Sequence, residues 1–237
     1  MSDVALVEFV GVVKHYQALR PLRMAELRVA PASIVSLQGL DALAAEVLVN
    51  LMTAAMRPDE GEVRLFGQPT SDIADYDQWL AMLDGLGLVT ERAVLLEQCT
   101  VAQNLALPTT LQIEPIRADV RVLVAALADE VGIPEAALET PVCNADADVV
   151  QRVRLGRALA LGPRLVVAEH PSATLPRAGV ERFARDLARV VSARGAALLA
   201  ISADREFTRA LGGTALVLDP KSGGLSRPGL LARLGLG

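Results

Sequence analysis

The sequence has few cysteine, lysine and aromatic residues, and it has no long hydrophobic run. Its two cysteines, Cys99 and Cys143, are too few for a disulfide framework and lack the spacing of a metal site, so we expect no metal. Aromatic residues are 3% of the 237 residues and the net charge is −5, which argues against a nucleic-acid binder with a basic, base-stacking face. Charged residues interrupt every apolar run before it reaches the ~18 residues that cross a membrane. The first ten residues lack a basic region and a cleavage site, so we expect no signal peptide and a cytoplasmic location.

What the sequence does have is a series of short apolar runs that alternate with helix-forming segments. The hydrophobic fraction of 52% is enough for a buried core. The pattern predicts strands within 4–13, 27–38, 62–67, 86–90, 165–170, 197–202 and 214–220. It predicts helices at 42–56, 116–131, 149–161 and 177–194, the first with Asp41 as its N-cap. Strands that alternate with helices indicate a mostly parallel sheet covered on both faces.

Several segments together resemble the nucleotide-binding subunit of ATP-binding cassette (ABC) transporters. The matching segments, which follow the order and spacing of that family, are IVSLQG (34–39), MRPDEGEVRLFG (56–67), TVAQNLALP (100–108) and QRVRLGRALALGPRLVVAEHPSATL (151–175). The resemblance implies an α/β fold with a RecA-like P-loop NTPase core, an N-terminal antiparallel β subdomain and a helical insertion. It also implies one domain over 1–237, with the core at about 1–90 and 150–220, the helical subdomain at about 91–149 and a Gly-rich tail at 221–237.

In this sequence, residues of another chemical type replace most of the defining residues of the family's phosphate loop. The family pattern GxxGxGK[ST] aligns with Gly39 to Glu46, so alanines replace two glycines, Ala45 replaces the lysine and Glu46 replaces the hydroxyl that holds Mg²⁺. No nearby lysine can substitute, because the two lysines are Lys14 and Lys221. An anion in the first turn of a helix is stabilised by the dipole, so Glu46 there would fill the anion site from within. A plain helix start with an acidic first turn is the alternative, and both interpretations predict that no phosphate binds.

The residues at the other family motifs also differ from the family pattern. The vestigial nucleotide site implied by the resemblance comprises Tyr16 at the adenine position, Gly39, Asp41, Ala42, Ala44, Ala45, Glu46, Val47, and Glu91 in place of a Gln. The degenerate signature comprises Asp146, Ala147 and Asp148; its two aspartates make it acidic, and they also suit the start of a helix. The vestigial catalytic positions are Glu169, His170 and Ala203. His170 could act as a base, but residues that would hold a nucleotide beside it are missing.

The family resemblance also implies partners. ABC subunits form dimers in which each ATP lies between one phosphate loop and the other subunit's signature, and this chain has changed both. The groove near Glu91–Leu107 would receive a membrane permease subunit, which would place the chain at the inner face of the membrane. Residues 93–98 either line this groove or pack the helical insertion onto the core.

Three functions follow. The first is a catalytically inactive subunit, without a cofactor, that serves a transporter-like assembly for export or lipid transport, as a homodimer or a heterodimer with another ABC subunit. The second is an ATPase that uses ATP and Mg²⁺ through a non-standard site built from Glu169, His170 and arginines. The third is a soluble scaffold dimer without a permease.

Overall fold

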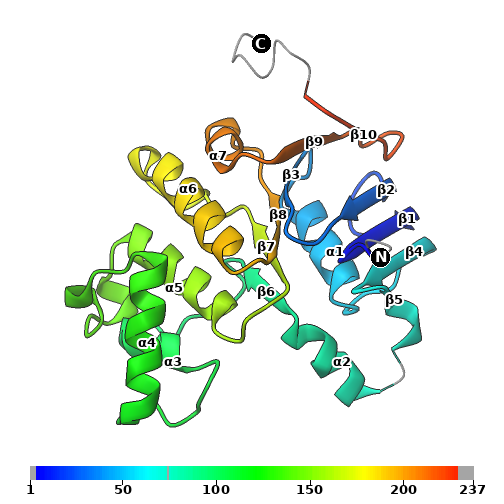
Figure 1. Ribbon diagram of the computed structural model, residues 1–237. Coiled ribbons are helices and arrows are strands. Elements are labelled where there is room, and N and C mark those ends of the chain that lie inside the picture. The colour runs from blue at the N-terminus through cyan, green and yellow to red at the C-terminus, as the bar shows by residue number, and fades with distance from the viewer. Residues whose placement is uncertain (1–3, 74, 229–237) are drawn as a thin grey trace.

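The computed structural model describes residues 4–73 and 75–228 as two sheets with helices around them (Figure 1). The smaller sheet is antiparallel, in the order β2-β1-β4-β5. Its strands are β1 (Val7–Lys14), β2 (Leu22–Val29), β4 (Glu60–Leu65) and β5 (Gln68–Pro69). This sheet confirms the predicted N-terminal antiparallel subdomain.

The larger sheet has the order β10-β9-β3-β8-β7-β6 and is parallel from β9 to β6. Its strands are β3 (Ile34–Gln38), β6 (Leu86–Val89), β7 (Leu165–Glu169), β8 (Ala197–Ile201), β9 (Thr214–Leu218) and β10 (Leu225–Ser226). β10 was not predicted; it lies in the segment 221–237 and pairs antiparallel with β9. Residues 229–237 of that segment lie outside the described part of the chain. Because the carboxyl ends of parallel strands share one edge, residues after β6 and β7 meet there.

Helices cover both faces of the larger sheet. They are α1 (Ala42–Met52), α2 (Tyr76–Asp84), α3 (Val101–Ala106), α4 (Ala118–Val131), α5 (Ala147–Leu159), α6 (Arg177–Ala193) and α7 (Arg205–Leu211). Single 3-10 turns occur at Thr70–Asp72, Glu135–Ala137 and Val142–Asn144. In Figure 1, α1 lies between the two sheets, while α3, α4 and α5 gather on the opposite side of the larger sheet. Residues 91–149 contain no strand, as predicted.

Alternate residues of the central strands enter two separate hydrophobic cores. Val166 and Ala168 face one core with Leu198, and this core continues through α6 into the helical segment. Leu165 and Val167 face the other core, which α1 and the antiparallel sheet complete. The period of two in a strand explains this division, because successive side chains point to opposite faces. A shared core therefore fixes the helical segment to the sheet that carries the candidate site.

Candidate functional site

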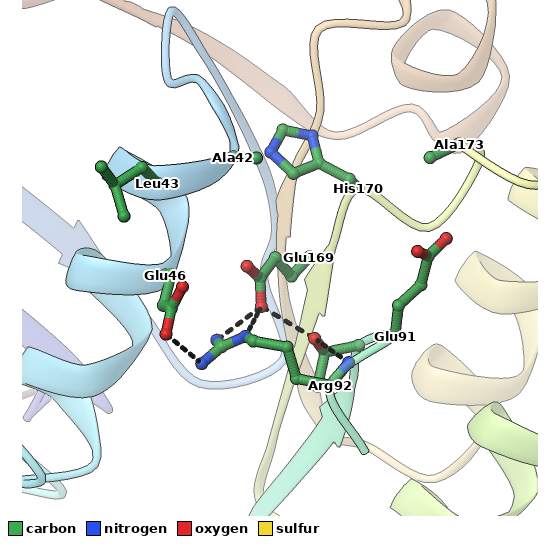
Figure 2. Close-up of a pocket in the computed structure, with 9 residues that line it drawn as sticks. Ala42, Leu43, Glu46, Glu91, Arg92, Glu169, His170 and Ala173 are labelled. Atoms are coloured by element: carbon green, nitrogen blue, oxygen red, sulfur yellow. Dashed lines mark hydrogen bonds and ion pairs between the residues drawn. The ribbon is translucent and has the colours of Figure 1, made fainter. Parts of the chain in front are cut away.

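A pocket of about 540 Å³ lies at the carboxyl edge of the larger sheet, beside the first turns of α1 (Figure 2). It is lined by Ala42, Leu43, Glu46, Thr90, Glu91, Arg92, Glu169, His170 and Ala173. Five of these residues were predicted from the sequence: Ala42, Glu46, Glu91, Glu169 and His170. Thr90 and Arg92 were not predicted, and Arg92 organises the pocket.

The Arg92 guanidinium reaches across the pocket to the carboxylate of Glu169 (Figure 2). Its Nη2 donates to Glu169 Oε2 at 2.7 Å, and its Nε donates to the same oxygen at 3.2 Å. The Thr90 hydroxyl donates to that oxygen at 2.9 Å. On the other side, Arg92 Nη1 lies 3.5 Å from Glu46 Oε1 and 3.5 Å from Asn50 Oδ1. One cation from the loop after β6 thus contacts both α1 and β7.

The burial of Glu169 explains why this arrangement forms. Its side chain is 9% exposed, and a carboxylate removed from water is costly unless it is paired and hydrogen-bonded. Arg92 supplies the charge and Thr90 a further hydrogen bond. Glu46 and Glu91 line the same pocket, so its lining includes three carboxylates and one guanidinium. The pocket is therefore acidic overall, with its cation held by Glu169.

The start of α1 differs in detail from the sequence prediction. Asp41 is the N-cap, as predicted, and its Oδ1 accepts the Ala44 N–H at 2.8 Å. The prediction that Glu46 lies in the first turn is wrong: the helix begins at Ala42, and its first turn has no acidic residue. The anion at this helix terminus is the Asp41 carboxylate, while Glu46 one turn later faces Arg92. A helix N-terminus favours a carboxylate at the N-cap, the position that Asp41 occupies.

Other predicted site residues near α1 do not line the pocket. Ala44, Ala45 and Val47 are buried in the core beside the antiparallel sheet. Gly39 has φ +91°, and a Cβ there would meet the Leu218 carbonyl oxygen at 2.6 Å, so this position requires glycine. Tyr16 is half-buried against the same core; burial, followed by the charge of Asp41, raises the pKa of its hydroxyl. The structure thus gives these residues packing roles.

His170 lies between the main pocket and a second one of about 300 Å³ that includes Ala203. It follows β7 directly and has φ +44°, an uncommon conformation for a residue with a side chain. Its Nε2 is buried without a hydrogen-bond partner among the described residues. Within 4–73 and 75–228, no three His, Cys, Asp or Glu side chains form a group that could hold a metal ion.

The acidic signature residues lie at the start of α5 and line neither pocket. Asp146 is at the N-cap position without a side-chain hydrogen bond, and Ala147 is the first helical residue. Asp148 Oδ2 accepts from Arg152 Nε at 2.8 Å and lies 3.1 Å from Arg182 Nη2. Arg152 also donates to Asp186 and to the Val131 carbonyl oxygen. Asp148 is therefore the counter-ion of a buried arginine.

A groove of about 300 Å³ lies between β6, the segment after it and α5, where the sequence predicts a partner site. Its lining includes Ala93, Leu95 and Leu107. Leu95 is buried in the helical core, whereas Val94 is 74% exposed and Leu96 42% exposed. Of the two alternatives for residues 93–98, Leu95 fits both, because it lines the groove and packs in the core of the helical segment. Val94 and Leu96 do neither, because they are exposed outside the groove lining.

Arg92 was not predicted, because the family pattern places the cation of this pocket at the position of Ala45. Its partner Glu169 is 77 residues away, so no local pattern joins them. The signal available in the sequence was the pair Glu91-Arg92 directly after a predicted strand, at the edge where site residues collect.

None of the helices in the described ranges combines the length and apolar character needed to cross a membrane.

Comparisons with known proteins agree with this fold. The chain is 30% identical over 186 residues to the lipoprotein-releasing system ATP-binding protein LolD of Maricaulis maris, covering 78% of this chain and 80% of LolD. It is 26% identical over 208 residues to the ribose import ATP-binding protein RbsA 3 of Rhizobium etli, covering 84% of this chain but 38% of that relative. The structure matches cbiO1 of Clostridium perfringens, part of the ABC transporter complex cbiONQ, with a TM-score of 0.76 and 14% identity over 94% of this chain and 87% of cbiO1.

No model of a known protein family matches the chain. The match to LolD is nevertheless close and long enough to assign the chain to a family. The antiparallel sheet, the parallel sheet and the helical segment described above agree with that assignment. The chain belongs to the family of ABC transporter ATP-binding subunits.

Proposed function

We propose that this chain is a catalytically inactive member of its family that serves as a structural or regulatory component of a membrane transporter assembly. The observation that carries the proposal is the ion pair of Arg92 and Glu169 inside the pocket, with Nη2 and Oε2 2.7 Å apart. The cation in this pocket already has a buried carboxylate partner. It is therefore not available to neutralise the charge of a triphosphate.

Electrostatics of the remaining lining supports the same proposal. Glu46 and Glu91 line the pocket without a lysine beside them. Two like charges 4 Å apart near a protein surface repel by about 4 kcal/mol. A triphosphate in this pocket would meet such repulsion from more than one carboxylate. The Ala44 N–H, which a phosphate loop would offer to its ligand, donates instead to Asp41.

The test is calorimetry and phosphate release with MgATP, on the wild type, Arg92→Ala and Arg209→Ala. Arg209 is exposed on α7 and serves as the matched control. We expect no saturable binding heat up to about 1 mM MgATP, which is the highest KM that enzymes usually have for a substrate. We also expect none of the three proteins to release phosphate faster than buffer alone. Micromolar binding, or release of phosphate above background, would overturn the proposal.

One observation favours a second candidate, an ATPase with a non-standard site. His170, whose buried Nε2 has no hydrogen-bond partner in the described part of the chain, lines the pocket that holds Arg92, so a base and a cation are present together. In that case Arg92→Ala lowers phosphate release sharply and Arg209→Ala leaves it unchanged. The same set of variants therefore separates the two functions.

We further propose that the groove lined by Ala93, Leu95 and Leu107 receives a membrane permease subunit. Apolar residues predominate in its lining, and exposed Val94 lies next to it in the chain. An apolar depression with exposed apolar neighbours is typical of a protein interaction site. Dimerisation with a second copy or with another ABC subunit is part of the same proposal. LolD, named as a component of a lipoprotein-releasing system, supports the export or lipid-transport class.

A further inference from the structure

Two arginines of α5, Arg154 and Arg157, line the groove and form no ion pair with a carboxylate among the described residues. Arg154 Nη1 donates to Gln151 Oε1 at 3.1 Å, and Arg157 Nη1 donates to the Val94 carbonyl oxygen at 2.6 Å. The Nε of Arg154 is buried and has no hydrogen-bond partner among the described residues. Both side chains are half-buried, so part of the hydration of each guanidinium is lost.

Comparison with Arg152, two residues earlier on the same helix, shows what is missing. Burial opposes the charge of Arg152, but hydrogen bonds to Asp148 and Asp186 outweigh it and raise the pKa of the guanidinium. For Arg154, burial lowers the pKa and the charge of Glu91 offsets this effect in part. Burial also lowers the pKa of Arg157. The charges of Arg154 and Arg157 are therefore left poorly compensated within the chain.

The rest of the groove defines what an incoming group must look like. Its wall is mainly apolar and is formed by residues of β6, of α5 and of the segments that follow them, among them Leu86, Leu95, Leu107 and Leu161. Two carboxylates lie nearby: Asp84 is exposed and lines the same groove, and the charge of Glu91 acts on Arg154. Neither forms an ion pair with Arg154 or Arg157 in the described ranges. A ligand therefore needs an apolar surface together with an anionic group.

We propose that the groove binds an apolar segment of a partner protein through a carboxylate that pairs with Arg154 and Arg157. The proposal deepens the function proposed above, because it states the chemistry of the partner that the groove receives. A guanidinium holds a carboxylate through two parallel N–H···O bonds, and two arginines on successive turns offer several such donors. Charge complementarity of this kind selects among partners more than it adds affinity.

Stability gives the first test, because a binding residue and a structural residue behave differently. Arg154→Met removes a poorly compensated charge and keeps the apolar stem, so we expect the melting temperature to stay the same or rise. Arg209→Met on the exposed face of α7 is the matched control and should cause no change. A marked fall in melting temperature for Arg154→Met alone would show that Arg154 stabilises the fold, and would overturn the inference.

Binding gives the second test, with displayed amphipathic helical peptides as the probe and the full chain as the target. The peptides are identical except for one central residue, which is Glu, Gln or Lys. We expect the Glu peptide to bind best, and Arg154→Met to weaken it about tenfold or more while leaving the Gln peptide unchanged. Arg154→Glu should shift the preference to the Lys peptide, a gain that a misfolded variant could not show.

Equal binding of the Glu and Gln peptides, or equal binding of the Glu peptide to the wild type and Arg154→Met, would overturn the inference. Inorganic phosphate serves as a competitor of the peptide. Competition that depends on the two arginines would agree with an anion site. Phosphate that binds as strongly as the Glu peptide would show that no apolar segment is needed and would overturn the inference. MgATP calorimetry on the same protein reports separately on catalytic inactivity. A positive MgATP result would therefore remove the proposed inactivity without affecting the peptide result.

Discussion

Arg152→Met is expected to lower the free energy of unfolding by about 3 kcal/mol, the low end of the usual range for breaking a buried ion pair. Asp148 and Asp186 lose their nearest counter-ion but keep their contacts with Arg182 and Arg189. The Arg152 side chain is 3% exposed and contacts Asp148, Asp186 and the Val131 carbonyl oxygen. Its removal breaks one hydrogen bond within α5 and two that join α5 to α4 and to α6. Urea unfolding followed by circular dichroism gives the measurement.

Arg182→Met is the matched control for this prediction. Arg182 lies 3.1 Å from the same Asp148 carboxylate oxygen, but its side chain is 65% exposed. Exposed ion pairs contribute between zero and about 1 kcal/mol, so the control should lose less than 1 kcal/mol. If the Arg152 variant lost no more than the Arg182 variant, Asp148 would not act as a structural counter-ion. The acidic signature would then need another explanation.

Phe183→Ala is expected to cost about 3–5 kcal/mol, the usual range for removing a buried ring. Phe183 is fully buried on α6 in the core that joins the sheet to the helical segment. Phe183→Leu keeps most of the volume and should cost about 1.5 kcal/mol or less. Thermal and urea unfolding of the two variants separate the loss of the ring from general disturbance of the core.

The two sites are also expected to interact. The Arg152 guanidinium carbon lies 5.9 Å from the centroid of the Phe183 ring, within the range of a cation–π contact. The double variant should therefore lose less stability than the sum of the single variants, by about 0.5 kcal/mol or more. Losses that simply add would show that the guanidinium and the ring contribute independently.

Periodicity in the sequence was sufficient to predict the sheet and the long helices, because burial of one face determines them. The strands at Leu165–Glu169 and Ala197–Ile201 and the helix at Arg177–Ala193 lie close to the predicted ranges. The first helix was predicted to reach residue 56 but ends at Met52. There the Thr53 hydroxyl donates back to the Val49 carbonyl oxygen, and the Thr53 carbonyl oxygen accepts from Trp79 Nε1. The first of these hydrogen bonds is local and the second is tertiary; tertiary contacts can override helix propensity.

Short elements were harder to predict than long ones. The helix Val101–Ala106 was not predicted, although Thr100 and Gln103 form a capping box that the sequence displays. The helix Tyr76–Asp84 and the two-residue strand Leu225–Ser226 carry too little periodicity to predict. These elements depend on the surfaces they pack against.

For the site, the motif positions predicted several of the residues that line the pocket, but not their roles. Glu46, Glu91, Glu169 and His170 were predicted to lie together, and they line one pocket. The internal cation was missed, because the pairing of Arg92 with Glu169 depends on the order of β6 and β7 in the sheet. Neighbouring parallel strands bring together residues that are far apart in the chain, and the sequence alone does not state this order.

The bridge from Arg92 to Glu169 and Glu46 joins the loop that opens the helical segment to two elements of the core. Since the bridging cation is encoded in the chain, its contacts do not rise and fall with the supply of a soluble metabolite. Under the function proposed above, a subunit joined in this way would act as a permanent adaptor. Any cyclic movement of the assembly around it would then be timed by another component.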